Sequence, residues 1–184
     1  MIEHTFEQLR NLRLGGMIHA LQQQQAQPAT YEELSFEERL TLLIDREYQS
    51  REDRKQERLI KAARFRLAAN LQQIDYQHPR GLQRSMIASL AQNDWIRKGR
   101  NLLITGPCGC GKTWIACALG HNACLQGYGV HYYRLSRLLI ELTQAKADGS
   151  WRKQLQQLAK TSLLIIDDWG LEPLTTAHRN DLME

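Results

Sequence analysis

The sequence contains no long apolar run, no secretory leader pattern and few cysteines, and each shortage excludes a class of protein. No stretch of 18 apolar residues occurs, so no membrane-spanning helix is predicted. The first residues do not combine a basic segment with an apolar core, so no signal peptide is predicted. We therefore expect a cytoplasmic protein whose four cysteines are reduced and which has no membrane partner.

Three residues with metal-binding side chains share one face of a predicted helix. Cys117, His121 and Cys124 follow one another at spacings of four and three residues. This pattern suits either a metal site or a face of small residues packed against a sheet. Because the sequence shows no fourth ligand nearby, we favour packing.

The overall charge is mildly basic. The 184 residues carry a formal net charge of +4, and the pI is about 9.0. This balance is compatible with a nucleic-acid partner but does not establish one. The length allows one ordinary domain with a smaller appendage.

An eight-residue segment carries the strongest functional signal. It matches the phosphate-binding pattern G-x-x-x-x-G-K-[ST] at every fixed position. Backbone N–H groups of such a loop cradle phosphates, so the segment predicts that the chain binds a nucleoside triphosphate. Lys112 is the expected catalytic cation for the outer phosphates, and Thr113 an expected Mg²⁺ ligand. The nucleotide-binding residues are Gly106, Pro107, Cys108, Gly109, Cys110, Gly111, Lys112 and Thr113.

The residues on either side of this loop support the match. The apolar run Asn101–Thr105 predicts a buried parallel strand before it, and residues 114–126 predict a helix after it. Gly127 and Gly129 are expected to end that helix. The N-terminus of the helix would then point at the phosphates and add its partial positive charge.

A second signal lies 55 residues after Lys112. Four apolar residues, Leu163 to Ile166, precede Asp167 and Asp168, which is the form of a Walker B strand. Acids at the carboxyl end of a parallel strand lie where ligands bind in open α/β sheets. We expect Asp167 to hold Mg²⁺ and Asp168 to polarise the attacking water. The alternative is a buried strand followed by an acidic turn.

Residues 1 to about 75 are predicted to form a small helical domain. Residues 22–27 form a glutamine-rich tract that ends at Pro28 and is expected to be a linker. Capping boxes are predicted at Thr30–Glu33 and Ser35–Glu38, and the second would open a helix running to about Leu71. Residues 75–81 are expected to interrupt the helical structure and to mark the boundary with an ATPase domain at residues 76–184.

Basic residues gather on the predicted long helix and on a later one. They indicate either a solvated helix face or contacts to DNA phosphates, and the sequence leaves both open. The candidate DNA-binding residues are Arg51, Arg54, Lys55, Arg58, Lys61, Arg64, Arg152 and Lys153.

The second half of the chain predicts an α/β fold with a parallel sheet. A strand is expected at residues 130–133, helices at 135–147 and 151–160, and a last strand at 163–167. With the strand before the phosphate loop this makes a sheet of three strands. That number is small for a P-loop NTPase, so we expect a fold truncated at its C-terminus.

Several segments together carry a family resemblance. They are residues 12–17 (LRLGGM), 34–40 (LSFEERL), 51–55 (REDRK), 61–65 (KAARF), the phosphate loop and residues 164–170 (LIIDDWG). On these residues the chain resembles the IstB family, the ATP-binding helper proteins of insertion-sequence transposition. It is similar, more distantly, to the helicase loader DnaC. Both are initiator-type AAA+ ATPases.

The resemblance implies a P-loop AAA+ domain behind a helical N-terminal domain, with ATP and Mg²⁺ as cofactors. It implies an ATPase that assembles as a homo-oligomer on double-stranded DNA and recruits or stimulates a transposase. The family's sensor elements and arginine finger have no counterpart in these residues, so weak hydrolysis is expected. A helicase loader, and a nucleotide-binding fragment without hydrolysis, are the alternatives.

Overall fold

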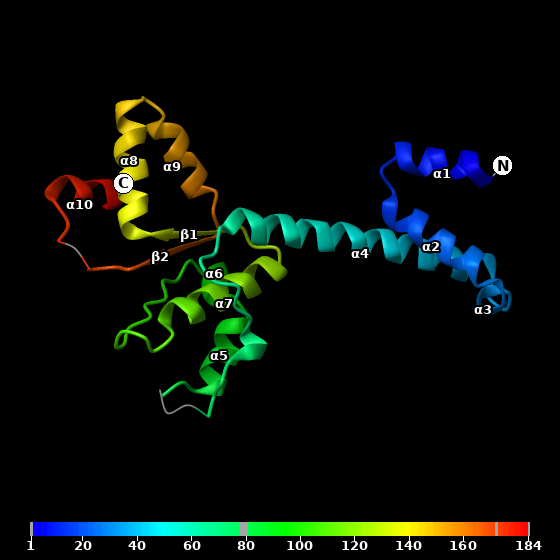
Figure 1. The fold of residues 1–184 in the computed structure, drawn as a ribbon, viewed down its shortest axis with the longest axis horizontal. Helices are drawn as coiled ribbons and strands as arrows, with labels where there is room; N and C mark the ends of the chain where they lie inside the picture. The colour runs from blue at the N-terminus through cyan, green and yellow to red at the C-terminus, as the bar shows by residue number, and fades with distance from the viewer. Residues whose placement is uncertain (1, 78–80, 172, 184) are drawn as a thin grey trace. The chain divides into compact units, whose positions relative to one another are not determined.

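A computed structural model describes residues 2–77, 81–171 and 173–183 (Figure 1). The chain divides into two compact units, Met1–Glu57 and Arg58–Glu184. Unit 1 contains α1 (Ile2–Asn11), α2 (Gly15–Ala26), α3 (Pro28–Tyr31) and most of α4 (Phe36–Ala63). Unit 2 begins in the last turns of α4. It continues with the 3₁₀ helix η1 (Leu71–Gln73), α5 (Arg84–Ala91), α6 (Asp94–Arg97), α7 (Lys112–Leu125), β1 (Val130–Arg134), α8 (Leu135–Ala147), α9 (Trp151–Ala159), β2 (Leu163–Asp167) and α10 (Thr176–Met183).

Within unit 1, α2 approaches α4 closely at Gly16. A Cβ atom at Gly16 would lie 2.6 Å from the carbonyl oxygen of Arg46 and 2.6 Å from Cα of Glu47. The Glu47 side chain, in a residue only 6% exposed, accepts hydrogen bonds from the N–H groups of Gly16 (2.7 Å) and Met17 (3.3 Å). These N–H groups belong to the first turn of α2, which has no helical partners for them. Glu47 therefore caps α2 from the neighbouring helix.

The local signals in unit 1 were partly right. The capping box at Ser35 is confirmed, because the Ser35 N–H donates to Glu38 Oε2 (2.7 Å) and the Glu38 N–H donates to Ser35 Oγ (3.3 Å). The box predicted at Thr30 is wrong, since Thr30 lies inside α3. The linker predicted at residues 22–27 is also wrong for most of its length, because α2 continues to Ala26. Glutamine has good helix propensity, and packing of α2 decides between the two states.

The long helix ends earlier than predicted. α4 stops at Ala63, and Arg64 adopts a left-handed conformation with φ of 55°. The backbone then turns, and Phe65 packs against Gly120 of α7, where a Cβ atom would lie 2.7 Å from the Phe65 ring. The favourable burial of this aromatic ring accounts for a helix end that helical periodicity alone did not reveal.

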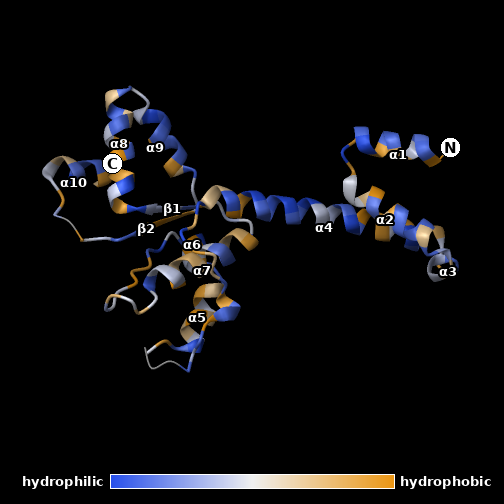
Figure 2. Ribbon diagram, viewed as in Figure 1, coloured by the Kyte–Doolittle hydropathy of each residue, from blue (hydrophilic) through white to orange (hydrophobic). Residues whose placement is uncertain are grey.

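The sheet of unit 2 is parallel and has two strands in the described residues. β1 pairs with β2 so that Tyr132 lies opposite Ile165 and Arg134 opposite Asp167. Tyr132 and Ile165 pack with Cys117 and Ala118 of α7, and α8 contacts β1. Figure 1 shows α7 on one side of the strands and α8 on the other, and Figure 2 shows that β2 is largely apolar.

The strands and helices after residue 111 are confirmed with small shifts at their ends, whereas the strand predicted at Asn101–Thr105 is wrong. These residues form neither helix nor strand, and Leu103 is 83% exposed. The sheet of the described residues thus has two strands, not three. The residues of β2 are only partly buried or exposed. An apolar run shows strand propensity, but a strand also requires a hydrogen-bonded neighbour.

The predicted boundary between the two domains remains open. The break predicted at residues 75–81 falls partly on 78–80, which lie outside the described residues. The boundary near residue 75 remains a prediction, since compact units are not a test of domain limits.

In the described part of the chain, no helix is both long and apolar enough to cross a membrane.

Candidate nucleotide-binding site

The phosphate loop leads directly into α7, a long helix of unit 2. Residues 106–111 form a turn, and α7 begins at Lys112. Gly109 (φ 79°) and Gly111 (φ 91°) occupy backbone conformations that side chains disfavour. The first N–H groups of α7 have no partners within the helix and carry its partial positive charge. This arrangement suits an anion such as a nucleotide phosphate.

Lys112 lies across the loop that precedes it. Its Nζ donates hydrogen bonds to the carbonyl oxygens of Gly106 (2.9 Å) and Pro107 (2.7 Å). The ammonium group is therefore held at the loop by acceptors that phosphate oxygens could replace, at little cost in hydrogen bonding. The remaining variable positions, Cys108 and Cys110, lie in the turn, with Cys108 exposed.

Thr113 and Asp167 meet although 54 residues separate them. Thr113 Oγ1 donates to Asp167 Oδ2 at 2.7 Å. The Tyr132 hydroxyl donates to the same oxygen, also at 2.7 Å. Burial opposes ionisation of Asp167, but these two hydrogen bonds and a nearby guanidinium, that of Arg66, hold its pKa below the ordinary value. Asp167 is therefore a carboxylate at neutral pH, next to the phosphate loop.

Asp168 lies beside Asp167 but turns to different partners. Its φ of 58° places it in the left-handed region, immediately after β2. Its Oδ2 lies 3.3 Å from Arg134 Nε and 3.8 Å from Arg66 Nη1. The two acids thus have different partners: Asp167 accepts hydrogen bonds from two hydroxyls, whereas Asp168 forms ion pairs with two guanidinium groups.

The donor set fits Mg²⁺. The cation prefers oxygen ligands and usually takes only one or two carboxylates from the protein, with water and phosphate completing the shell. A hydroxyl and a carboxylate oxygen, Thr113 Oγ1 and Asp167 Oδ2, lie together next to the phosphate loop. Among the described residues, no group of three His, Cys, Asp or Glu side chains could hold a metal by itself. A bound nucleotide would have to supply the other ligands.

Comparison with known proteins agrees with this geometry. Residues 7–184 match the family described as IstB-like ATP binding protein. The chain belongs to this family. A relative from Pseudomonas fluorescens, named for ATP binding and for insertion sequence IS1162, is 53% identical over 100% of this chain and 80% of its own length. One from Sinorhizobium fredii, with a similar name, is 41% identical over 100% of this chain and 75% of its own length.

Membership in the IstB-like family confirms the predicted fold class, a P-loop α/β fold with a helical N-terminal part. It also shows that the chain is an ATP-binding protein of the insertion-sequence type. The structure brings Lys112, Thr113, Asp167 and Asp168 to one end of the sheet of this fold.

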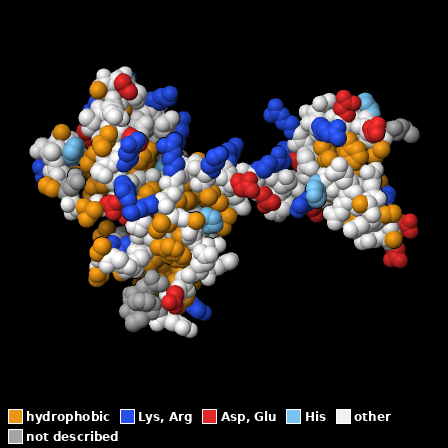
Figure 3. All heavy atoms as spheres, in the orientation of Figure 1, with side chains coloured by type: hydrophobic (Ala, Val, Ile, Leu, Met, Phe, Trp, Pro, Cys, Tyr) orange, Lys and Arg blue, Asp and Glu red, His pale blue; other side chains and the backbone are white. Residues whose placement is uncertain are grey.

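The candidate DNA-binding residues are all exposed, but they differ in their ion pairs. Figure 3 shows Lys and Arg side chains in several places on the visible surface. Arg51 and Arg54 lie 2.7 and 3.6 Å from Glu47 Oε1, and Lys55 lies 3.5 Å from Glu52. Arg58 and Lys61 have no ion pair within the described part of the chain. Among the candidates on α4, these two cations are therefore the ones most available to phosphates. Arg152 and Lys153 project from the first turn of α9.

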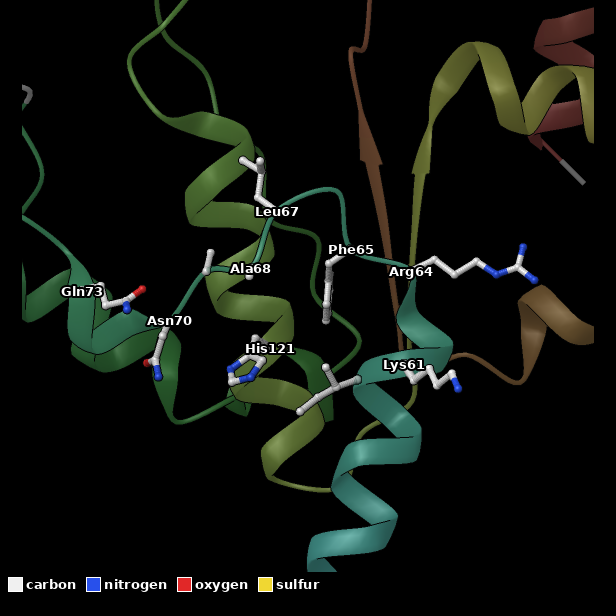
Figure 4. A pocket seen from close by; sticks show the side chains of 10 residues that line it. Lys61, Arg64, Phe65, Leu67, Ala68, Asn70, Gln73 and His121 are labelled. Atoms are coloured by element: carbon white, nitrogen blue, oxygen red, sulfur yellow. The ribbon is translucent and has the colours of Figure 1, made fainter.

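A separate pocket of about 510 Å³ lies between the end of α4, the following loop and α7 (Figure 4). Asn70, Gln73 and His121 line it, and the side chains of Lys61 and Arg64 point away from them. The outward direction of these two basic side chains leaves them accessible from solvent.

The face that carries Cys117 and Cys124 is packed. Both thiols are fully buried in apolar clusters, and burial raises the pKa of each, that of Cys124 to about 11. Protonated, buried thiols are poor metal ligands, which agrees with the packing interpretation.

Sequence reasoning missed three residues of the site. Tyr132, Arg134 and Arg66 contact the two acids, yet none was a candidate. The side-chain alternation along β1 could have pointed to Tyr132 and Arg134. In a parallel pair, residues two apart share a face, so polar groups near the end of one strand lie near the end of its neighbour. Arg66 lies after a helix end that the sequence did not reveal.

Proposed function

We propose that the chain is an ATP-hydrolysing helper of insertion-sequence transposition. It acts in the cytoplasm as a homo-oligomer on double-stranded DNA, where it recruits or stimulates a transposase. The observation that carries the ATPase part is the contact between Thr113 and Asp167 beside the phosphate loop, with Asp168 next in sequence. The names of the relatives, which join ATP binding to insertion sequences, support the biological role.

The nucleotide would bind through the loop amides and Lys112. The backbone N–H groups of the loop, which Pro107 lacks, would surround the phosphates, and Lys112 would exchange its two carbonyl partners for phosphate oxygens. Thr113 and Asp167 would hold Mg²⁺, which supplies positive charge to the phosphate oxygens when it is bound.

Asp168 is the residue we assign to the attacking water. A carboxylate can orient a water molecule and accept its proton, but Arg134 and Arg66 lie at this carboxylate in the structure. Water activation therefore requires these ion pairs to loosen. Because each is partly exposed, the exchange of partners costs little.

DNA binding is assigned to exposed cations of α4 and α9. Phosphate contacts need accessible positive charge and no sequence-specific geometry. Of the candidates on α4, Arg58 and Lys61 meet this requirement best, because Arg51, Arg54 and Lys55 lie in ion pairs. Arg64, just after α4, and Arg152 and Lys153 of α9 are the further candidates.

Steady-state phosphate release tests the ATPase assignment. Wild type should hydrolyse ATP in the presence of Mg²⁺, and Asp168→Asn should reduce the rate by about a hundredfold, the usual contribution of a general base. Asp45→Asn, which removes an exposed acid from α4, is the matched control and should keep the wild-type rate. Equal rates for wild type and Asp168→Asn would exclude the assigned role.

Salt-dependent binding to duplex and single-stranded DNA tests the DNA assignment. The logarithm of affinity should fall with the logarithm of salt by roughly 0.9 for each phosphate neutralised. Arg58→Gln with Lys61→Gln should flatten this dependence by about two such contacts. Lys98→Gln with Arg100→Gln removes the same charge elsewhere and should not. An unchanged slope would make α4 a solvated face, and a preference for single strands would favour a helicase loader.

A further inference from the structure

Tyr132 is buried, and its hydroxyl donates a hydrogen bond to Asp167, the carboxylate assigned to Mg²⁺. The residue is 8% exposed, and its hydroxyl donates to Asp167 Oδ2 at 2.7 Å. Thr113 Oγ1 donates to the same oxygen at the same distance. One carboxylate oxygen thus receives two hydroxyl donors, one from α7 and one from β1.

The strand register explains how the phenol reaches Asp167. Tyr132 lies opposite Ile165, and Asp167 follows Ile165 by two residues, so all three lie on one face of the sheet. This face packs on α7, where the Tyr132 ring contacts a cluster with Cys117 and Ala118. The ring is therefore fixed by packing, and only its hydroxyl makes a polar contact with the site.

Tyr133 has the opposite orientation. It lies opposite Ile166, on the other face of the sheet, and its hydroxyl interacts with Glu141 of α8 and Gln154 of α9. The two neighbouring tyrosines of β1 thus offer the same chemical group in two settings. One setting includes a Walker B acid and the other does not.

We propose that Tyr132 is a positioning residue that holds the Asp167 carboxylate in the orientation needed to bind Mg²⁺ together with a nucleotide. This inference rests on the proposed function, because it assumes that Asp167 serves the cation. Groups that hydrogen-bond a metal ligand fix its orientation, and their removal typically lowers metal affinity by about 10- to 100-fold.

The arrangement gives Tyr132 a role that Thr113 cannot fill alone. Thr113 is itself assigned to the cation, so its hydroxyl serves two partners when the site is loaded. The Tyr132 hydroxyl is held by a ring packed in the core and is not itself assigned to the cation; besides Asp167, it interacts with the Arg66 side chain. Rotation of the carboxylate away from the loop would break the Tyr132 contact and leave a buried hydroxyl without its acceptor, which is unfavourable.

The decisive variant is Tyr132→Phe, which keeps the ring and removes only the hydroxyl. Nucleotide binding is measured by calorimetry at increasing Mg²⁺, and once in EDTA without the cation. The Mg²⁺ concentration that gives half of the maximal increase in affinity should rise about tenfold. The affinity measured in EDTA should stay unchanged, because the loop is intact. Tyr133→Phe, the matched control, should show the wild-type Mg²⁺ dependence.

A double-mutant cycle separates positioning from general packing. If Tyr132 acts through Asp167, then Tyr132→Phe should cause no further change in Mg²⁺ dependence in the Asp167→Ala background. A tenfold further change in that background would overturn the proposal, as would a Tyr132→Phe protein with wild-type Mg²⁺ dependence. If Tyr132→Phe keeps the wild-type Mg²⁺ dependence, the proposed function still stands, provided that the wild-type protein binds nucleotide in a Mg²⁺-dependent way. A wild-type protein that binds no nucleotide would overturn both.

Discussion

Replacing Gly16 with alanine is a direct probe of the packing in unit 1. The added Cβ atom would lie 2.6 Å from the backbone of Arg46 and Glu47, where an ordinary contact begins at 3.4 Å. Both neighbours are backbone atoms of α4, so they cannot rotate away. The helices must separate by most of an ångström, which also stretches the 2.7 Å bond from the Gly16 N–H to Glu47.

The expected cost follows from these two effects. Overpacking costs about 1–3 kcal/mol. A hydrogen bond to a charged group contributes about 1.5–3 kcal/mol, and weakening this one adds a part of that amount to the cost. Alanine returns at most about 1 kcal/mol in helix propensity. We therefore expect Gly16→Ala to destabilise unit 1 by about 2–4 kcal/mol.

Gly15→Ala is the matched control, because no atom lies within 4 Å of its added Cβ. It should be neutral or stabilise α2 by up to about 1 kcal/mol. Urea unfolding followed by circular dichroism gives the stabilities, and hydrogen exchange of peptides from α2 and α4 shows where protection is lost. Equal stability of the two variants would refute the close approach at Gly16.

Three further predictions concern acid stability, core packing and the loop. The pKa of Glu47 lies below its ordinary value of 4.5, since its hydrogen bonds with Arg51, Gly16 and Met17 outweigh the effect of burial. The ionised form therefore stabilises the fold above about pH 4.5, and this stability is lost as the pH falls through the lowered pKa; Glu47→Gln should reduce that loss in acid-unfolding curves. Gly120→Ala should cost about 1–3 kcal/mol in urea unfolding, because its Cβ would lie 2.7 Å from Phe65 and Ile165. Cys108→Ser with Cys110→Ser should change calorimetric ATP affinity by less than about threefold, because the loop binds phosphates through its amides.

Each of these predictions has an outcome that contradicts it. An acid-unfolding curve of Glu47→Gln that is parallel to wild type would show that the carboxylate is not ionised in its hydrogen-bonded place. Gly129→Ala, whose added Cβ meets no atom within 4 Å, is the control for Gly120→Ala, and similar stability of the two would contradict the close contact. A large loss of ATP affinity in the double serine variant would mean that the thiols take part in binding.

Local patterns predicted the parts of the fold whose cause is local. The phosphate loop, α7, and the strand that ends in Asp167 each follow from residues that are neighbours in sequence. The Ser35–Glu38 cap is local in the same sense, since both partners lie within one turn. Patterns of this kind carry their physical reason within a few residues, so no tertiary information was needed.

The rest depends on contacts between distant residues. Asn101–Thr105 has the composition of a strand, but the described residues give it no hydrogen-bonded neighbour. The end of α4 depends on Phe65 meeting Gly120, and the cap of α2 depends on Glu47, which lies on another helix. Alternation places Tyr132 and Arg134 on one face of their strand, but the contact of Tyr132 with Asp167 also depends on the strand register.

The central claim is that the loop binds ATP through Lys112, and ligand-dependent unfolding tests it most directly. With Mg²⁺ present, ATP at a hundredfold excess over its dissociation constant should stabilise the wild-type protein by about 2.7 kcal/mol. At the same ATP concentration Lys112→Ala should gain much less, while Lys98→Ala, which removes an exposed lysine elsewhere, should gain as much as wild type. Equal stabilisation of wild type and Lys112→Ala would contradict the account.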